Sequence, residues 1–374
     1  MEVQQDKPFI IAYYLPQYHP IPENDEWWGK GFTEWTNVAK AKPLFKGHYQ
    51  PKIPADLGFY DLRVPEVREQ QAELAREAGV DGFCYWHYWF GNGKELLERP
   101  FKEVVESGKP DFPFCLGWAN EDWQAKIWNV DRTTNTRKTL IKQTYPNHDD
   151  YILHFNRYKK AFNDPRYIRI NGKPVFLIYK PLQFTEIKYF LQQWNNLVFQ
   201  ENIAQEFHFI GVVDDEQDIE TIKKMGFSSA TLNVNNRMSQ PYLKKPFFIQ
   251  LILNSVRKRF HRPLIIPYSQ SIKFLWNEEK DVDDFFIPTI LPNWDHSPRS
   301  RENALILNNS NPILFKKHCM QILKGIKKKT NKIVFLKSWN EWGEGNYLEP
   351  DLKFGTQYIK ALKESINDVY GKND

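Results

Sequence analysis

Eight short apolar segments recur along the chain, and they constrain its fold more than any other feature of the sequence. The segments are PFIIAYY (8–14), VDGFCYW (80–86), FPFCLGW (112–118), PVFLIY (174–179), FHFIGVV (207–213), FSSATL (227–232), FFIPTIL (285–291) and IVFLKSW (333–339). Their apolar character is nearly continuous rather than alternating, which is typical of strands covered on both faces in a parallel sheet. Helical stretches separate them: PEVREQQAELAREAG starts with Pro65 and ends with Gly79, and EQDIETIKKMG ends with Gly226. The repeated order of strand and helix predicts an α/β fold.

Eight such units predict a (β/α)₈ TIM barrel, which typically needs about 250 residues. The chain has 374 residues, so the excess has to lie in insertions. Three long connections, 15–64, 119–148 and 233–284, each follow a strand, and in a barrel such loops form the catalytic face. A doubly wound sheet with a helical cap is the alternative. No internal repeat or Gly/Ser linker divides the sequence, so we expect a single domain over residues 1–374.

The general composition argues against several classes of protein. Hydrophobic residues make up 41% and charged residues 26% of the chain, which fits neither a disordered chain nor a membrane channel. No apolar run approaches the roughly 18 residues of a spanning helix, and the first residues, MEVQQDKPFI, lack the pattern of a signal peptide. We therefore expect a cytoplasmic protein. The cysteines Cys84, Cys115 and Cys319 are too scattered for a disulfide framework or a metal site, and we expect them to be buried.

Aromatic residues are unusually frequent, with 13 Trp, 18 Tyr and 27 Phe. Trp and Tyr combine a flat apolar face with a polar edge, which suits sugars and also nucleobases. The formal net charge is only +5, and most Trp residues lie among carboxylates and amides rather than among Lys and Arg. This pattern favours a carbohydrate partner and argues against nucleic acid.

The common cofactor and nucleophile motifs are absent from the sequence. It contains no GxGxxG after a strand, no GxxxxGK followed by Ser or Thr, no HExxH and no GxSxG. We therefore expect no cofactor and no metal. The acidic runs VVDDE and DVDD are an alternative metal site of a nucleotide-sugar transferase, but short Asp clusters are usually solvated.

Polar and aromatic clusters follow five of the predicted strands: YYLPQYHPIPENDEWWGKGFTEW, WHYWF, GWANEDW, LPNWDHSPR and SWNEWGEG. A single Trp or His after a strand is more often packing, as we expect for Trp89 and His148. Five clusters at strand ends, however, meet around one pocket in a barrel. The predicted substrate-binding residues are Tyr14, Gln17, His19, Trp28, Glu34, Trp35, Trp86, His87, Tyr88, Trp118, Asn120, Glu121, Trp123, Tyr179, Asp214, Asn293, Trp294, Asp295, Trp339, Asn340 and Trp342.

The segment SWNEWGEG contains the predicted catalytic pair, Glu341 and Glu344. If the segment turns helically after its strand, residues three apart lie on one face, about 5 to 6 Å apart at Cβ. Repulsion and unequal burial then separate the two pKa values and leave one acid and one base. Cleavage of a glycosidic bond needs such a pair. An exposed acidic turn is the alternative.

Together, YYLPQYHPIPENDEWWGKGFTEWTNV, GFCYWHYWF, GWANEDW and SWNEWGEG closely resemble the WbsX-type proteins of bacterial surface polysaccharide gene clusters. These are similar to the endo-α-mannosidases of glycoside hydrolase family 99. The resemblance implies a (β/α)₈ barrel and a retaining mechanism through a 1,2-anhydro sugar. In that mechanism Glu341 assists the substrate 2-hydroxyl, and Glu344 is the general acid and then the base. Where the hydrolases tend to have Phe and His, this chain has Trp339 and Gly343, so the subsites differ.

These observations predict an enzyme of O-antigen or capsule metabolism that cleaves or transfers at a glycosidic bond of an oligo- or polysaccharide. A glycosyltransferase using a nucleotide-sugar or lipid-linked donor, and a catalytically silent carbohydrate-binding barrel, are the alternatives. WbsX-type proteins are usually labelled glycosyltransferases, although the sequence shows no nucleotide-sugar motif. The intact Glu pair argues against a pure binding protein, which needs aromatic residues but no matched acid and base.

Residues 237–262 form a basic segment without Asp or Glu, and PFFIQLILNSV lies within it. Its basic residues are Arg237, Lys244, Lys245, Arg257, Lys258, Arg259 and Arg262. The apolar part is too short to span a bilayer but could rest at an anionic interface, next to a lipid-linked substrate. An ordinary barrel helix with a basic outer end is the competing interpretation.

Overall fold

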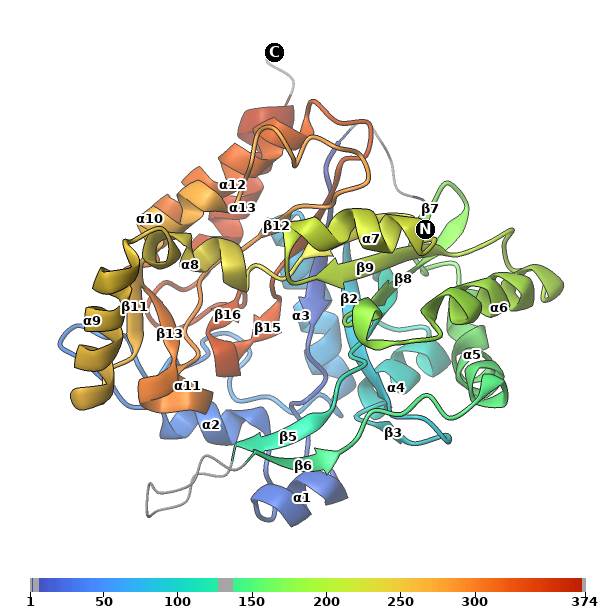
Figure 1. Ribbon diagram of the computed structural model, residues 1–374. Coiled ribbons are helices and arrows are strands. Elements are labelled where there is room, and N and C mark those ends of the chain that lie inside the picture. The colour runs from blue at the N-terminus through green and yellow to red at the C-terminus, as the bar shows by residue number, and fades with distance from the viewer. Residues whose placement is uncertain (1, 3–6, 127–136, 372–374) are drawn as a thin grey trace.

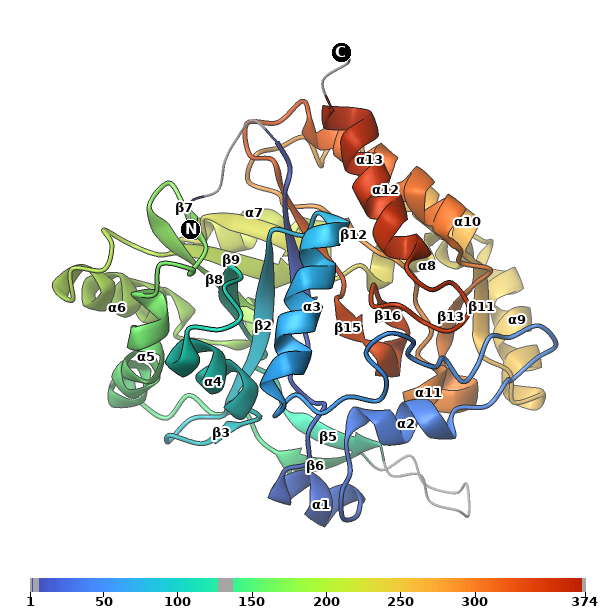
Figure 2. The same ribbon diagram turned by 180° about the vertical axis from the view of Figure 1, so that it is seen from behind.

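The centre of the fold is a nearly closed parallel barrel with helices around it (Figures 1 and 2). The computed structural model describes residues 2, 7–126 and 137–371. Within these residues the barrel strands are β1 (Phe9–Tyr14), β2 (Gly82–Trp89), β4 (Phe114–Trp118), β8 (Lys173–Ile178), β9 (His208–Val213), β10 (Ser229–Leu232), β12 (Thr289–Ile290) and β14 (Ile333–Leu336). Each overlaps one of the eight predicted segments, although β2 extends three residues beyond its segment and β8 begins one residue before its own. The predicted strands and the α/β barrel are therefore confirmed.

The strands pair in the order β10-β9-β8-β4-β2-β1-β14-β12, and each neighbouring pair is parallel. The first and last strands of this order meet through a single bridge between Ala230 and Phe286 and through the hydroxyls of Thr231 and Thr289, 3.3 Å apart. These contacts nearly close the sheet on itself. Because the strands are parallel, their carboxyl ends lie at the same end of the barrel.

Seven helices of the described part cover the barrel: α3 (Pro65–Ala78), α4 (Arg99–Ser107), α5 (His148–Phe162), α6 (Ile187–Gln200), α7 (Ile219–Lys224), α12 (Pro312–Ile326) and α13 (Gln357–Tyr370). The helix predicted from Pro65 is confirmed as α3. It ends at Gly79, whose φ of +83° is a left-handed cap that favours glycine. The helix predicted before Gly226 is confirmed as α7.

The three long connections follow β1, β4 and β10, as predicted, and contain structure of their own. The first holds α1 (Pro22–Trp28) and α2 (Glu34–Lys40), and the second holds the hairpin β5 (Trp123–Lys126) and β6 (Arg137–Ile141). Residues 127–136 of the second connection lie outside the described residues. The third holds α8 (Asn235–Leu243), α9 (Phe247–Arg259), β11 (Leu264–Pro267) and α10 (Tyr268–Ser271).

A small second sheet beside the barrel was not predicted. Strand β11 pairs in parallel with β13 (Leu305–Asn308), which follows β12 and the one-turn helix α11 (Ser297–Ser300). This sheet shares an apolar cluster with α8 and α10 that includes Met238, Tyr268 and Trp294. Its strands are only four residues long, so they show too little periodicity to be recognised from sequence.

The remaining elements are short. They are β3 (Glu95–Leu96), β7 (Arg169–Ile170), β15 (Asn340–Glu341), β16 (Asn346–Tyr347) and 3₁₀ turns at Pro181–Gln183, Glu216–Asp218, Ile272–Phe274, Arg301–Asn303 and Trp342–Glu344.

The structure contradicts the barrel-helix interpretation of residues 237–262. Helix α9 belongs to the third connection, lies outside β11 (Figure 1), and none of its side chains is buried. Arg237 does not belong to the exposed basic group, because it is buried and paired with Asp281 and Glu216. Among the described residues, the helices are all too short or too polar to cross a membrane.

Candidate active site

The turn that carries Glu341 and Glu344 is a tight hairpin after β14 rather than the predicted α-helical turn. Strands β15 and β16 pair Glu341 with Asn346, and the 3₁₀ turn Trp342–Glu344 lies between them. Gly345 follows with a φ of +62°, and a Cβ there would lie 2.6 Å from Lys52 Nζ. Glycine is therefore required for both conformation and space. The turn still brings both carboxyls to the same side, as is shown by the single guanidinium that both of them bind.

That guanidinium belongs to Arg299, in the one-turn helix α11. Its Nη2 donates to Glu341 Oε1 at 2.9 Å, and its Nη1 donates to Glu344 Oε1 at 2.8 Å. Its Nε donates to Glu34 Oε2 at 3.2 Å, and Nη2 lies 3.1 Å from the same oxygen. We call Glu34, Glu341, Glu344 and Arg299 the carboxylate cluster. Three segments far apart in sequence meet in it, each following a different barrel strand.

The two carboxyls of the pair have opposite pKa shifts. Burial raises the pKa of Glu341 to about 8, although Arg299 opposes the shift. Burial also acts to raise the pKa of Glu344, but Arg299, His296 and Lys337 outweigh it, so that this pKa is lowered. The two shifts together favour a proton on Glu341 over a proton on Glu344. The resemblance implies the opposite distribution, with Glu341 ionised and Glu344 protonated.

Hydrogen bonds from the first long connection hold the hairpin in place. Leu15 N donates to Asn340 Oδ1 at 2.7 Å, and Asn340 Nδ2 donates back to Leu15 O at 3.0 Å. Tyr18 OH donates to Asn340 O at 2.6 Å and accepts from Trp342 N at 3.1 Å. The Trp342 ring stacks on Tyr347, with ring centres 3.7 Å apart. Asn340 and Trp342 therefore hold the hairpin that carries Glu341 and Glu344, and both are fully buried.

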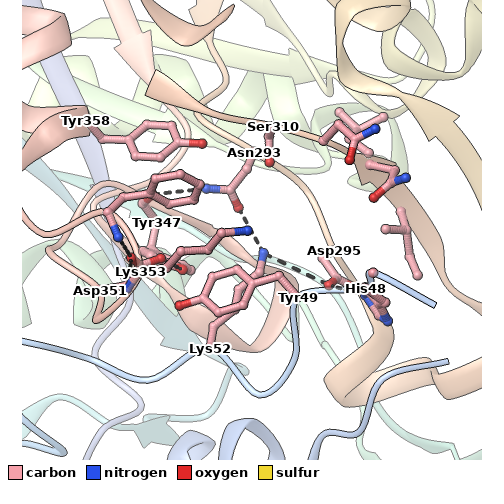
Figure 3. A pocket seen from close by; sticks show the side chains of 16 residues that line it. His48, Tyr49, Lys52, Asn293, Asp295, Ser310, Tyr347, Asp351, Lys353 and Tyr358 are labelled. Atoms are coloured by element: carbon pink, nitrogen blue, oxygen red, sulfur yellow. Dashed lines mark hydrogen bonds and ion pairs between the residues drawn. The ribbon is translucent and has the colours of Figure 1, made fainter. Parts of the chain in front are cut away.

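Buried polar residues support the hairpin from behind (Figure 3). Asp295 N donates to Glu344 O at 2.7 Å, while the Asp295 carboxylate accepts from Gln50 Nε2 at 2.6 Å and lies 2.9 Å from His48 Nε2. The bond from His48 and the charge of Lys52 outweigh burial and hold the pKa of Asp295 well below its usual range. Figure 3 shows His48, Lys52 and Asp295 beside a cavity, which has a volume of about 50 Å³ and therefore room for water.

Lys52 links the same layer to the turn. Its Nζ donates to Asn293 Oδ1 at 3.3 Å and to Gly345 O at 3.4 Å. The predicted residues Asn293 and Asp295 thus lie directly behind the pair and orient its backbone. Both are buried, and Asp295 contacts the pair directly through the hydrogen bond from its N to Glu344 O.

Several other predicted residues lie around the carboxylate cluster. Gln17 Nε2 donates to Tyr88 OH at 2.9 Å, and the Tyr88 hydroxyl interacts electrostatically with Glu341 and Glu34. On another side, Tyr179 interacts electrostatically with Glu121, Glu344 and Asp214. These residues therefore share one region with the pair.

Aromatic rings line the inside of the barrel below this region. Trp86 stacks on Tyr13 at a centre distance of 5.1 Å and meets Tyr179 edge-on at 5.5 Å. Lys180 Nζ lies 2.8 Å from Asp214 Oδ2, and Asn233 Nδ2 donates to Asp214 Oδ1 at 3.1 Å. Asn233 also donates to the Tyr179 hydroxyl at 3.3 Å. A flat ring and several polar groups are thereby presented together, which is the combination that binds a sugar.

Three of the predicted binding residues face away from the barrel interior. Tyr14 OH donates to Gln71 of α3 at 2.6 Å, His87 Nε2 lies 2.9 Å from His154 Nε2 of α5, and Trp118 Nε1 donates to Trp89 O. All three pack between the barrel and its helices, so their prediction as binding residues is wrong. Successive strand residues alternate between faces, and the inward positions are one residue earlier.

Four further predicted residues lie away from the pair. His19 is buried, and its electrostatic partners are Asp61, Arg63 and Arg99. Trp28 is exposed and packs on Phe32. Asn120 joins the loops after β4 and β8 through Lys180 N and O, and Trp123 packs on Tyr88.

The last three predicted residues pack beside or behind the site. Trp35 packs on Trp342, and Trp339 is buried against Phe83. Trp294 belongs to the cluster of the second sheet, with Lys337 Nζ 5.5 Å from its ring centre. The two acidic runs are paired with cations, since Asp214 binds Lys180 and Asp281 binds Arg237.

The sequence prediction missed Arg299, Tyr13, His48 and Lys52. The sequence prediction rests on carboxyls and sugar-binding rings, and Arg299, at the end of LPNWDHSPR, is neither. Three carboxyls expected around one pocket require a compensating cation. The presence of an arginine within one of the polar clusters at the strand ends was the signal that could have identified Arg299 as this cation.

The first prediction from this geometry concerns Gly343, where a Cβ would overlap Glu34 Oε2 and lie 2.9 Å from Arg299 Nε. We expect Gly343→Ala to lower the free energy of unfolding by about 1–3 kcal/mol, because overpacking strains the cluster. Urea unfolding measures this cost. When Glu34 is also replaced by Ala, the atom closest to the new Cβ is absent. The loss of unfolding free energy caused by Gly343→Ala should then be smaller by at least about 0.5 kcal/mol. Equal costs in the two backgrounds would contradict the packing argument.

The second prediction concerns the proton on Glu341. An unfolded glutamate titrates near pH 4.3, whereas the folded pKa is about 8. The stability that Glu341 contributes is therefore present at low pH and is lost as the pH rises from about 5 to 8. Over this range the unfolding free energy of the wild type, relative to Glu341→Gln, should fall by more than about 1.4 kcal/mol, the equivalent of one pKa unit.

Urea unfolding of both proteins at pH 5, 6, 7 and 8 measures this difference. Buried histidines such as His87 and His154 have lowered pKa values, which make stability rise with pH below about 6.5. Their contribution is the same in both proteins, so it cancels in the difference. A difference that does not vary with pH would show that Glu341 does not hold the proton.

Comparisons with known proteins agree with this architecture. A model of the family described as "Glycosyltransferase WbsX" matches residues 10–362. The chain is 35% identical over 369 residues to "Uncharacterized protein WxcX" of Xanthomonas campestris pv. campestris (strain B100), covering 96% of this chain and 49% of that protein. It thus spans about half the length of the curated relatives it matches.

Solved structures share the fold. A "Glycoside hydrolase-like protein" has a TM-score of 0.57 at 17% identity, with 97% of this chain and 95% of that chain covered. The family 99 endo-α-mannosidase from Bacteroides thetaiotaomicron has a TM-score of 0.53 at 14% identity, with 96% of this chain and 98% of that chain covered. Both proteins share the TIM-barrel fold with this chain, and the similarity is one of fold alone. The match over nearly all of the sequence shows that the chain belongs to the WbsX glycosyltransferase family.

Proposed function

We propose that this chain is a carbohydrate-active enzyme of bacterial surface polysaccharide metabolism that cleaves or transfers at a glycosidic bond of an oligo- or polysaccharide. The observation that carries the proposal is the pair Glu341 and Glu344, whose carboxyls bind one guanidinium and whose pKa values are shifted in opposite directions. Glycosidic-bond chemistry needs a carboxyl that donates a proton and a second one that is ionised. The glycoside hydrolase fold of the structural neighbours supports the same class.

In the proposed reaction Glu341 removes the proton of the substrate 2-hydroxyl as that oxygen attacks the anomeric carbon. The bond to the departing sugar breaks, and Glu344 gives its proton to the leaving oxygen. A 1,2-anhydro sugar results. Water or an acceptor hydroxyl then attacks the anomeric carbon and gives its proton to Glu344. The C1–O2 bond breaks, Glu341 returns its proton to O2, and the anomeric configuration is retained.

This order requires the proton of the free protein to pass from Glu341 to Glu344. Both carboxyls bind the same guanidinium, so the transfer leaves the net charge of the carboxylate cluster unchanged. No charge has to leave or enter the buried region, and the transfer therefore avoids the free-energy cost of desolvating a charge in a low-dielectric site. We therefore propose that substrate binding shifts the proton within the pair.

A glycosyltransferase is the second candidate, because the matching family bears that description. Incubation with a panel of glycans, and separately with nucleotide sugars, distinguishes the two. We expect new reducing ends or transglycosylation products and no release of nucleotide. Nucleotide release without cleavage of any glycan would favour the transferase. The cytoplasmic location, the lipid-linked substrate and the single domain remain predictions from the sequence.

The third prediction separates the roles of the two carboxyls. Glu344→Gln cannot protonate a departing oxygen, so we expect it to lose about 10²- to 10⁴-fold in rate on natural glycans and much less on activated aryl glycosides. Glu341→Gln should slow both substrate types, because internal attack precedes departure, while glycan binding persists. Steady-state kinetics and isothermal titration measure these effects.

The opposite pattern, with Glu341→Gln selective for poor leaving groups, would show that the proton distribution of the free protein persists in the complex. Losses below tenfold for both variants, with the fold intact, would exclude this pair as the catalytic one. Glu34, Glu121 and Asp295 would then be the next carboxyls to test. Glycan binding without any turnover by the wild type would indicate a silent binding barrel.

The fourth prediction concerns the substrate 2-hydroxyl. If Glu341 acts only through this group, a 2-deoxy substrate should be turned over as slowly by the wild type as the natural substrate is by Glu341→Gln. Combining the deoxy substrate with Glu341→Gln should cause little further loss, because groups that act as one unit are not additive. Multiplicative losses would argue against assistance at this position.

A further inference from the structure

Helix α9 exposes an apolar surface on a segment that packs only loosely on the rest of the molecule. We call this surface the α9 face; its residues, with their exposed fractions, are Phe247 (74%), Phe248 (63%), Leu251 (51%), Ile252 (58%), Val256 (47%) and Phe260 (65%). Phe248, Ile252, Val256 and Phe260 are spaced four apart, and Phe247 and Leu251 lie beside them, so they form one stripe. Only the opposite side of the helix makes contact, through residues such as Leu253.

The surroundings of the α9 face are cationic. Lys244 and Lys245 precede the helix, Arg257, Lys258 and Arg259 form its last turn, and Arg262 follows. No Asp or Glu occurs in the sequence from residue 221 to residue 277. Lys258 and Arg259 occupy the same exposed side of the helix as the apolar stripe. An apolar stripe with basic groups at both ends is the pattern that binds a membrane surface containing anionic lipids.

We propose that the α9 face docks this protein onto an anionic lipid bilayer, with the helix lying in the interface plane. The helix has 13 residues and is therefore about 20 Å long, too short to span a bilayer but long enough to rest its side chains among the headgroups. Its exposed position at the edge of the molecule (left in Figure 1) leaves it accessible to a flat surface.

A second copy of the chain fits the α9 face less well. In a symmetric dimer the same patch of both subunits would meet. The basic ends of one helix would then face the basic residues of the other, and the segment contains no carboxylate to neutralise them. Anionic headgroups supply the missing negative charge, while acyl chains cover the phenylalanines.

The α9 face is connected to the carboxylate cluster through the second sheet. Helix α9 leads into β11, which pairs with β13, and α11 with Arg299 directly precedes β13 in the chain. The unit that docks is therefore the unit that supplies Arg299. The proposal itself does not depend on the glycosidic chemistry, because it concerns lipid binding alone.

The fifth prediction tests lipid binding by sedimentation with vesicles. We expect the wild type to sediment with vesicles of phosphatidylcholine and phosphatidylglycerol, to bind pure phosphatidylcholine at least tenfold more weakly, and to be released by 0.5 M salt, which screens the basic groups. Phe248→Ser with Ile252→Ser should lower binding to the mixed vesicles at least tenfold, and Lys258→Gln with Arg259→Gln should do the same.

Matched controls alter other faces. Leu153→Ser with Phe199→Ser removes comparably exposed apolar side chains from α5 and α6, and Lys224→Gln with Lys328→Gln removes two exposed charges elsewhere. Both controls should bind like the wild type, and thermal unfolding verifies that every variant is folded. Equal binding by α9 and control variants, or no binding by the wild type, overturns the proposal. A dimer that dissociates in Phe248→Ser/Ile252→Ser, without vesicle binding, would assign the face to a second copy and also overturn it.

Discussion

The contact of one guanidinium with three carboxylates organises the candidate site. Arg299 reaches Glu34, Glu341 and Glu344, which come from the connections after β1 and β14, while Arg299 itself follows β12. Taking like charges out of water is costly unless a cation is shared among them, and removing one partner of such a group leaves an uncompensated buried charge. The contact therefore brings the three carboxyls together, and it lowers the pKa of both Glu341 and Glu344 against the effect of burial.

The residues around the cluster have to leave space for that contact. Glycine at position 343 does so, because any side chain there would meet Glu34 and Arg299. A layer of buried hydrogen bonds through Asn340, Tyr18 and Asp295 then fixes the backbone of the hairpin.

The barrel and the second sheet contribute different things to the molecule. The barrel brings the ends of its parallel strands together, which collects Trp86, Tyr179 and Glu344 in one region. The second sheet is built from two connections and carries both Arg299 and the exposed helix α9. The pairing of β11 with β13 thus connects the segment that carries Arg299 to the segment that carries the exposed helix α9. Neither the cluster LPNWDHSPR nor the basic segment 237–262 reveals this connection when it is read by itself.

The sequence by itself was sufficient for the eight strands, the barrel and the glutamate pair, because apolar runs and a short acidic motif are local signals. It could not assign the faces of the strands. Tyr13 and Tyr14, or Trp86 and His87, are equally suited to the inside of the barrel when both faces of a strand are buried. Only the tertiary structure decided that Tyr14 and His87 contact helices. It also decided the proton's position, since the pKa values of Glu341 and Glu344 depend on burial and on Arg299, which lies 42 and 45 residues away in the chain.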